Sequence, residues 1–243
     1  MKAVVLAGGR GTRLAPYTAI LPKPLMPVGD RPILDIILCQ LRSYGFLDVT
    51  LAVGYLSELV MAYFGDGRRH GVRITYSQED RPLGTAGPLG ILDPPAEPFL
   101  VINGDVLTDM DFAAMHRCHL ASRAVATVAV YPRTIQAEFG VIEVGSDDCI
   151  VDYVEKPQRE ALASIGVYVF SPQIARYVPR NRYLDMPELI NLLVREGHRP
   201  RCFRQVAYWL DIGRPADYEK AQVDMEALGR RILGNGRSDA KYS

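Results

Sequence analysis

The segment GGRGTRLAPYTAILPKPL, residues 8 to 25, brings glycines, arginine and lysine together directly after the apolar run 3–7. Glycine lacks a Cβ, so the backbone can turn tightly and direct several N–H groups at one anion. The residues suited to this are Gly8, Gly9 and Gly11, with the hydroxyl of Thr12 as a further donor. Arg13 offers a planar pair of donors, and Lys23, between two prolines, a point charge. This combination suits the binding of a triphosphate and a reaction that moves negative charge.

Two common glycine-rich phosphate loops do not match this segment. The P-loop carries a lysine directly after its second glycine, whereas Gly11 is followed by Thr12. The dinucleotide fingerprint has a third glycine at the start of a helix, whereas Leu14 occupies that place and four nearby prolines disfavour an early helix. We therefore expect an extended loop until about Pro32. An ordinary strand-to-helix turn would not need prolines around a lysine.

A carboxylate that could hold a metal ion follows a second apolar run. Asp105 comes shortly after residues 99–102, and ligands of open α/β sheets bind at the carboxyl ends of the strands. Mg²⁺ usually takes one or two carboxylates together with substrate phosphates, which makes Asp105 a candidate ligand beside the first loop. Asp109 and Asp111 form a DxD pattern, but the helical spacing of residues 112–119 favours a helix cap.

The elements that must position these residues alternate between strand and helix patterns, which is typical of a layered α/β fold. In the first half we predict strands at 3–6, 49–53, 72–76 and 99–102 and helices at 33–44, 56–64 and 85–91. Strands at 125–130, 140–144, 150–155 and 164–170 lie closer together and predict a mixed or antiparallel region, and a helix is predicted at 215–228. The predicted fold class is therefore α/β, a Rossmann-like mixed sheet flanked by helices.

Together with the first loop, six motifs resemble the sugar nucleotidyltransferases, also called nucleoside-diphosphate-sugar pyrophosphorylases. These motifs are PLGTAGPL (82–89), NGDVLTDMD (103–111), FGVIEV (139–144), VEKP (154–157), SIGVYVF (164–170) and WLDIG (209–213). They follow one another across nearly the whole chain, and the first two are most similar to the mannose-1-phosphate guanylyltransferase branch.

This resemblance implies the nucleotide-diphospho-sugar transferase fold in a single domain, residues 1–228. A nucleotide-binding half would span about 1–123 and a sugar-phosphate-binding half about 124–228. The left-handed β-helix that many members append is not expected, and residues 229–243 are expected to form a polar, flexible tail.

The resemblance also implies roles for individual residues. Arg13 and Lys23 would be catalytic, and Asp211 would join Asp105 in holding Mg²⁺. The residues expected to bind the sugar phosphate are Gly140, Glu155, Lys156 and Gly166, with Lys156 on the phosphate and Glu155 on a sugar hydroxyl. Ser164 departs from the asparagine usual in the family and offers no amide donors.

For the nucleobase, an amide side chain and close backbone approach are expected. The nucleotide-binding candidates are Leu6, Ala7, Gly8, Gly9, Gly11, Thr12, Gln78, Gly84 and Thr85. Neither purine nor pyrimidine is excluded by these residues.

The implied reaction joins an NTP and a sugar 1-phosphate into an NDP-sugar, with release of pyrophosphate. GTP with mannose 1-phosphate or a similar hexose or heptose 1-phosphate is favoured, and glucose 1-phosphate with dTTP, UTP or CTP is the alternative. Two alternatives of other classes are a catalytically silent nucleotide-sugar sensor or regulatory subunit and a glycosyltransferase that uses Asp109 and Asp111. A silent relative would be expected to have lost at least one of the charged site residues, which are all present.

Composition restricts the partners. The 28 basic side chains balance 28 acidic ones, so a nucleic-acid partner is not expected, and no apolar stretch approaches the length that spans a bilayer. We expect a cytoplasmic enzyme whose partners are its two substrates, and a homo-oligomer is compatible with the sequence. The cysteines are expected to be buried free thiols without zinc or disulfides; they are Cys39, Cys118, Cys149 and Cys202. Trp209 is expected to be a packing residue that holds Asp211. The four histidines match no metal or triad spacing.

Overall fold

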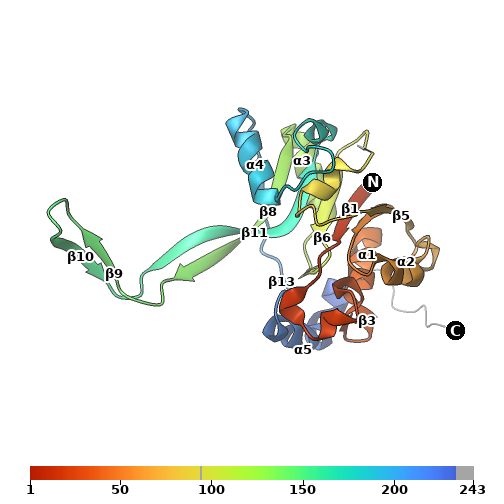
Figure 1. The fold of residues 1–243 in the computed structure, drawn as a ribbon, viewed down its shortest axis with the longest axis horizontal. Coiled ribbons are helices and arrows are strands. Elements are labelled where there is room, and N and C mark those ends of the chain that lie inside the picture. Colours follow the sequence, from red (N-terminus) through yellow and green to blue (C-terminus); the bar gives the residue numbers. More distant parts are fainter. Residues whose placement is uncertain (94, 234–243) are drawn as a thin grey trace.

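A seven-stranded mixed sheet forms the body of the protein in the computed structural model, which describes residues 1–93 and 95–233 (Figure 1). The strand order is β12-β8-β11-β6-β1-β4-β5. The bounds are β1 (Lys2–Ala7), β4 (Asp48–Val53), β5 (Arg73–Gln78), β6 (Phe99–Asn103), β8 (Ala126–Gln136), β11 (Gln158–Phe170) and β12 (Arg201–Arg204). Strands β5, β4, β1 and β6 run parallel, whereas β11 runs antiparallel to β6 and β8. The predicted mixed α/β sheet is confirmed.

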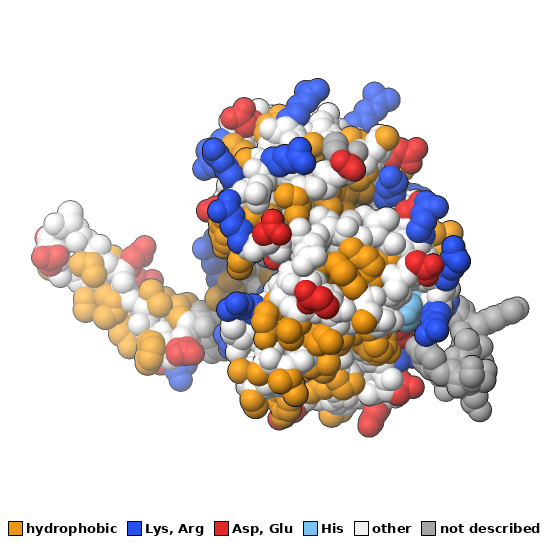
Figure 2. Space-filling view, turned by 45° about the vertical axis from the view of Figure 1, so that its right-hand side comes forward, with side chains coloured by type: hydrophobic (Ala, Val, Ile, Leu, Met, Phe, Trp, Pro, Cys, Tyr) orange, Lys and Arg blue, Asp and Glu red, His pale blue; other side chains and the backbone are white. Residues whose placement is uncertain are grey.

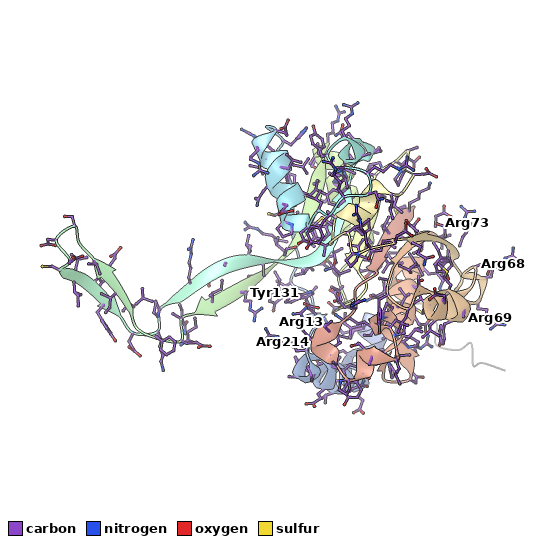
Figure 3. All side chains as sticks on the ribbon, viewed as in Figure 1. Arg13, Arg68, Arg69, Arg73, Tyr131 and Arg214 are labelled. Atoms are coloured by element: carbon purple, nitrogen blue, oxygen red, sulfur yellow. The ribbon has the colours of Figure 1, made fainter. Side chains whose placement is uncertain are left out.

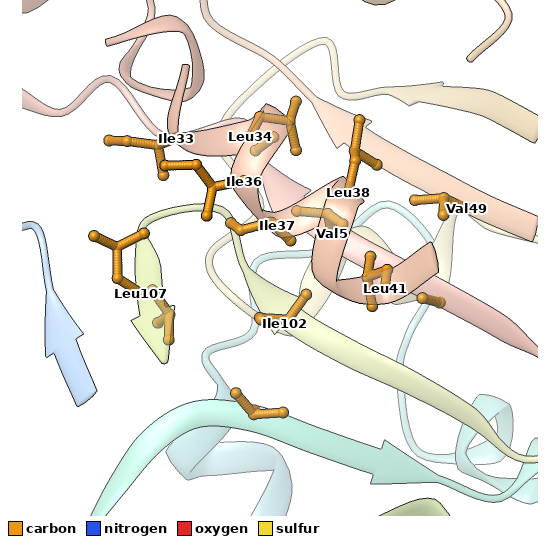
Figure 4. Packing of buried hydrophobic residues seen from close by; sticks show 14 of the residues in the cluster. Val5, Ile33, Leu34, Ile36, Ile37, Leu38, Leu41, Val49, Ile102 and Leu107 are labelled. Carbon is orange, nitrogen blue, oxygen red and sulfur yellow. The ribbon is translucent and has the colours of Figure 1, made fainter. Parts of the chain in front are cut away.

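Alternate side chains of the central strands enter two apolar layers, because successive residues of a strand point to opposite faces. Val5 and Ile102 pack on one face with α1 (Ile33–Ser43), as Figure 4 shows. The same layer receives residues from α2 (Ser57–Phe64), α3 (Phe112–Ser122) and α5 (Pro215–Ile232). Val4 and Val101 point to the other face and pack with α4 (Met186–Arg195).

Several elements differ from the sequence-based expectation. Residues 85–91 form only a short 3-10 segment, Gly87–Gly90, because two glycines and a proline disfavour an α-helix there. Helix α4 and strand β12 were not predicted, although the capping box formed by Asp185 and Glu188 is visible in the sequence as D-x-x-E. Helix α5 continues to Ile232, past the expected end at 228; of the expected tail, residues 234–243 lie outside the described part.

The first loop contains short helical turns and is not simply extended. It forms 3-10 turns at Thr12–Leu14, Tyr17–Ala19 and Lys23–Leu25, and the first α-helix begins at Ile33, after the prolines. The small ribbon β2 (Pro27–Val28) and β3 (Arg31–Pro32) closes the segment. Each of these turns contains only three residues, so the N–H groups that the prolines lack are not needed for its hydrogen bonds.

An arm, defined here as residues 132–163, projects from the body. It consists of the outer halves of β8 and β11, which remain paired as far as Gln136 and Gln158, and of a terminal hairpin. That hairpin is formed by β9 (Val141–Val144) and β10 (Ile150–Val154), which pair only with each other (Figure 1). The strands of the hairpin were expected at 140–144 and 150–155, whereas the outer halves of β8 and β11 and their projection from the body were not predicted.

The predicted burial of the cysteines is wrong. Cys39 is half-buried, and Cys118, Cys149 and Cys202 are exposed because they lie on the outer side of α3, in the turn of the arm and on the edge strand β12. All four are free thiols, as expected. Over the described ranges, no helix has both the length and the apolar character that a membrane crossing requires.

The histidines have structural partners. His70 contacts the Asp35 carboxylate at 2.6 Å, His116 the Pro98 carbonyl at 3.1 Å and His198 the Tyr177 hydroxyl at 2.5 Å. The side chain of His119 is enclosed between the hydroxyls of Thr127 and Ser171, at 2.9 and 3.0 Å. These contacts give each histidine a structural role in the fold.

Burial, with a smaller contribution from His116, lowers the pKa of His119 from 6.5 to about 4. The unfolded chain therefore binds the proton more readily than the folded one between these values, so stability is expected to fall as the pH drops from about 6.5 to 4. Chemical denaturation across this range measures the slope. His119→Gln retains a donor and an acceptor and should flatten the dependence of the unfolding free energy on pH, whereas the control His198→Gln should leave that dependence unchanged. An unchanged dependence in His119→Gln would contradict its assignment to His119.

Candidate active site

The four parallel strands end at one edge of the sheet, and the loops that follow them form the candidate site. Their common direction brings together Gly8 after β1, Gly54 after β4, Glu79 after β5 and the Gly104–Asp105 turn after β6. The Gly104 N–H donates to the Leu6 carbonyl at 2.9 Å, and the Tyr55 N–H donates to the Gly8 carbonyl at 3.2 Å. This edge is where ligands bind in open α/β sheets.

A second ribbon brings Asp211 to Asp105 from more than 100 residues away. Strand β13 (Trp209–Asp211) pairs antiparallel with β7 (Val106–Thr108), and Asp211 lies opposite Val106 in the register. The Ile212 N–H donates to the Asp105 carbonyl at 3.0 Å. The indole N–H of Trp209 donates to the Ile165 carbonyl at 3.1 Å, which supports the predicted role of Trp209 in holding this ribbon.

The carboxylates of Asp105 and Asp211 lie close together, and each has a buried oxygen that no hydrogen bond satisfies. Oδ1 of Asp105 and Oδ1 of Asp211 are both buried and lack a hydrogen-bond partner. Burial first, and then the negative charge of Asp105, raise the pKa of Asp211, while Lys23 and Arg13 oppose the increase. Buried acceptors that repel each other are costly, and a cation between them would relieve both effects.

This donor set fits a hard divalent cation. Mg²⁺ prefers oxygen ligands and commonly takes one or two carboxylates, leaving other positions for water and phosphate. Within residues 1–93 and 95–233, no group of three or more His, Cys, Asp or Glu side chains could hold a metal by itself. A two-carboxylate site would therefore depend on substrate oxygens to complete its coordination.

Lys23 and Arg13 approach the same carboxylates from the first loop. The Lys23 ammonium pairs with Oδ2 of Asp105 and is largely buried. Arg13 is exposed, and its guanidinium lies against Gly213, where an added Cβ would be 3.2 Å from a guanidinium nitrogen. Gly11 permits this arrangement through its positive φ of 62°, since a side chain there would meet both Thr18 and Lys23. Cations from the loop thus meet a carboxylate from the turn after β6 and another from β13 at one place.

The loop glycines leave backbone exposed toward this site. A Cβ at Gly9 would have open space around it, whereas one at Gly8 would lie 2.5 Å from Oε1 of Glu79. The carbonyl of Thr12 accepts from the Ala15 N–H at 3.2 Å, while its side chain is exposed. Leu6 and Ala7 are the last residues of β1, and the Leu6 carbonyl already accepts from the Gly104 N–H.

Glu79 was not singled out from the sequence. Its Oε2 accepts from the Leu83 N–H at 3.1 Å, and its carboxylate lies against both Gly8 and Gly54. Burial raises the pKa of Glu79, although the Leu83 hydrogen bond opposes this. The signal that could have identified it is a carboxylate directly after a parallel strand that was already predicted.

The predicted base-binding residues lie beside Glu79 but have other partners. The Gln78 amide donates to the Ser57 hydroxyl at 3.1 Å. The N–H of Thr85 donates to Asp185 at 3.0 Å, and the Thr85 hydroxyl accepts from the Met186 N–H at 2.7 Å, which ties the loop to the start of α4. Gly84, with a φ of 78°, has no room for a Cβ against the Leu184 carbonyl. These residues fix the loop that carries Leu83 toward Glu79.

The predicted sugar-phosphate residues fall into two separate groups. Gly166, with a φ of 78°, lies in the body, where an added Cβ would be 2.6 Å from the Asn103 amide nitrogen. Gly140, Glu155 and Lys156 lie on the arm, with Gly140 against Tyr153 and Glu155. Ser164, at the base of the arm, has its hydroxyl 3.1 Å from the Tyr168 hydroxyl. The structure brings Arg13, Lys23, Asp105 and Asp211 together, but not the arm residues with them.

The DxD aspartates are engaged in the fold, as predicted for Asp111. Its Oδ1 accepts from the Ala114 N–H at 2.7 Å and caps α3. Oδ1 of Asp109 accepts from the Tyr208 N–H at 2.7 Å, and Oδ2 pairs with Arg231. This disfavours the glycosyltransferase alternative, which would need both carboxylates for a metal.

Sequence comparison finds related proteins over nearly the whole chain. The family described as nucleotidyl transferase matches residues 2–227. The UTP–glucose-1-phosphate uridylyltransferase of Synechocystis sp. is 33% identical, over 91% of this chain and 62% of that protein. The probable mannose-1-phosphate guanylyltransferase 1 of Oryza sativa subsp. japonica is 33% identical, over 97% and 70% respectively. The chain thus spans less than two thirds of the first relative.

Solved structures share the fold. HddC from Yersinia pseudotuberculosis, crystallised in complex with GMP-PN, aligns with a TM-score of 0.70 and 25% identity, over 92% of this chain and 99% of that one. A putative glucose-1-phosphate thymidylyltransferase from Bacillus anthracis, in complex with a sucrose, aligns with a TM-score of 0.76 and 23% identity, over 96% and 98%.

Proposed function

We propose that this chain, which belongs to the nucleotidyl transferase family, joins an NTP and a sugar 1-phosphate into an NDP-sugar and pyrophosphate. The observation that carries the proposal is the convergence of Arg13 and Lys23 with the paired carboxylates of Asp105 and Asp211. Relatives named as uridylyltransferase and guanylyltransferase support the same reaction type with different bases.

In this reaction a phosphate oxygen of the sugar 1-phosphate attacks the α-phosphorus of the NTP, and the bond to the pyrophosphate oxygen breaks. The attacking oxygen is already anionic, so alignment and charge stabilisation are sufficient and no general base is required. Arg13, exposed beside Gly213, would stabilise charge on the transferring and leaving phosphates. Lys23 would exchange part of its contact with Asp105 for the α-phosphate.

Mg²⁺ is the cofactor that we propose for Asp105 and Asp211, and when bound it would neutralise phosphate charge. The two unpartnered oxygens support this assignment. The protein's own contribution is to place Asp211 on β13, opposite Val106 of β7, and Asp105 directly before β7, where its carbonyl accepts from the Ile212 N–H.

For the base we propose guanine, and Glu79 supplies the chemical argument. A carboxylate only accepts hydrogen bonds, and guanine presents neighbouring N1–H and N2–H donors on one edge. Uracil and thymine present a single ring N–H between two carbonyls. The partly buried Glu79 carboxylate, beside the backbone of Gly8 and Gly54, is suited to the two-donor edge. Mannose 1-phosphate or a similar hexose or heptose 1-phosphate is the proposed acceptor.

Glu79→Gln is expected to lower kcat/KM for GTP about 10- to 100-fold, because a charged acceptor contributes about 1.5–3 kcal/mol. The value for UTP should change much less. Steady-state kinetics with both nucleotides measures the ratio, and Asp80→Asn, an adjacent exposed carboxylate, is the matched control. Equal losses for GTP and UTP would remove Glu79 from base selection.

The overall proposal is tested by pyrophosphate release with Mg²⁺ across all common NTPs, combined with mannose, glucose, galactose, N-acetylglucosamine and heptose 1-phosphates. We expect turnover with GTP and one of the sugars. Nucleotide binding without turnover in any combination would favour the silent-sensor alternative.

A further inference from the structure

The arm carries half of the proposed sugar site away from the body of its own chain. Glu155 and Lys156 are exposed and directly follow β10, where the terminal hairpin joins the outer halves of β8 and β11, whereas Asp105 and Gly166 belong to the body; Figure 1 shows the arm extending away from that body. Two phosphorylated reactants repel each other, so the acceptor phosphate needs a cation of its own near the carboxylate pair. Within one extended chain, Lys156 does not supply it.

The arm does not bend back easily toward its own site. Strands β8 and β11 stay in register from Val130 and Ser164 out to Gln136 and Gln158. The Ala137 N–H then donates to the Pro157 carbonyl at 3.1 Å and joins this ribbon to the terminal hairpin. Bending the arm onto its own body would break part of this ladder, whereas docking on a second molecule would preserve it.

The arm exposes more apolar surface than a solvated hairpin needs. Among the residues that the structure describes, 21 large hydrophobic side chains are exposed, and ten of these lie on the 32 residues of the arm: Ile135, Phe139, Val141, Ile142, Val144, Ile150, Val151, Tyr153, Val154 and Leu162. Phe139 is 76% exposed, and Figure 2 shows apolar side chains along the arm. An isolated two-stranded ribbon is marginally stable, and such a patch usually marks an interface.

Charge indicates what would cover this surface. The arm has seven acidic and three basic side chains, so the rest of this neutral chain has 25 basic and 21 acidic ones. Arg13 and Arg214, both exposed, lie with Tyr131 on the side of the body from which the arm departs (Figure 3). An acidic arm is therefore complementary to the body of another copy of the same chain.

We propose that the arm docks on a second copy of this chain and places Glu155 and Lys156 at the partner copy's carboxylate pair. The exchange would be reciprocal, giving a two-fold dimer in which each active site is built from two chains. The inference deepens the proposed function and rests on it for the sugar 1-phosphate acceptor, with Lys156 in the role that the family resemblance implies. Docking would bury the apolar side of the arm and complete the site at the same time.

Complementation between two defective variants tests the exchange. Lys156→Ala disables the arm and Arg13→Ala the body, and both replaced side chains are exposed, so the fold should survive. Differently tagged chains are co-expressed, and the mixed dimer is isolated by two affinity steps. One of its two sites would combine an intact body with an intact arm, so we expect about half the wild-type activity per dimer. If each chain used its own arm, both sites would be defective and the mixed dimer would be inactive, which would overturn the proposal.

Mass measurement by light scattering keeps the test independent of catalysis. We expect a dimer for the wild type and a monomer when residues 137–157 are replaced by a short turn. An active monomeric wild type would overturn the proposal, as would a dimer that persists without the hairpin. A wild type that dimerises through the arm but turns over no sugar phosphate would refute the proposed function while supporting arm docking.

Discussion

Asp211→Asn is expected to lower kcat at least 1000-fold and, at the same time, to make the folded protein more stable. The neutral amide loses the charge that a divalent cation requires, and it also ends the repulsion from Asp105 in a buried setting. The raised pKa of Asp211 means that its ionised form is disfavoured in the fold, so at neutral pH this charge destabilises the protein. Removing it should add on the order of 1 kcal/mol, or about 2–4 °C in Tm.

Steady-state kinetics with Mg²⁺ measures the loss of kcat. Thermal unfolding of the same preparation without added Mg²⁺ measures the change in Tm. Asp217→Asn is the matched control, because Asp217 is a further negative charge acting on Asp211 but lies in the first turn of α5. That variant should retain kcat within about threefold. A loss of activity together with a clear drop in Tm would identify structural damage and would contradict the assignment of Asp211 as a ligand.

Arg13→Ala is expected to lower kcat about 100- to 1000-fold with a smaller change in the KM of the nucleotide. Its guanidinium is exposed beside Gly213, so removal of the side chain should cost little stability. A preorganised donor that meets charge developing in the transition state contributes about 3–4 kcal/mol, which corresponds to this range. Steady-state kinetics separates the two parameters.

The neighbouring arginine provides the comparison for this prediction. Arg10 belongs to the same loop but lies over the ring of Tyr55, 5.4 Å from its centroid. Arg10→Ala should reduce kcat by less than tenfold, whereas Arg13→Lys should recover part of the activity, since it restores the charge without the planar fork. A change in KM alone for Arg13→Ala would show that Arg13 binds substrate and transition state equally.

The two ends of the proposed site differ in how firmly the fold holds them. The proposed phosphate end of the site is built from loops that follow neighbouring strands, with backbone hydrogen bonds such as that from the Gly104 N–H to the Leu6 carbonyl. The proposed sugar end depends on the arm, whose strands β9 and β10 pair only with each other. Substrate selection for the sugar would therefore respond to whatever covers the arm.

The parts of the candidate site that depend on neighbours along the chain could be read from residue order and spacing. The glycine loop with Arg13 and Lys23, the turn carrying Asp105 and the cap made by Asp111 could all be predicted, because strand ends, prolines and helix starts have local signatures. The resemblance implied that Asp211 joins Asp105, but the pairing of β7 with β13 that brings them together is seen only in the folded chain. The folded chain also shows that Glu79 fills the space beside Gly8 and that Lys156 stands apart from Gly166. Strand pairings across 100 residues and the direction of an arm follow from register and packing, which residue spacing along one chain does not specify.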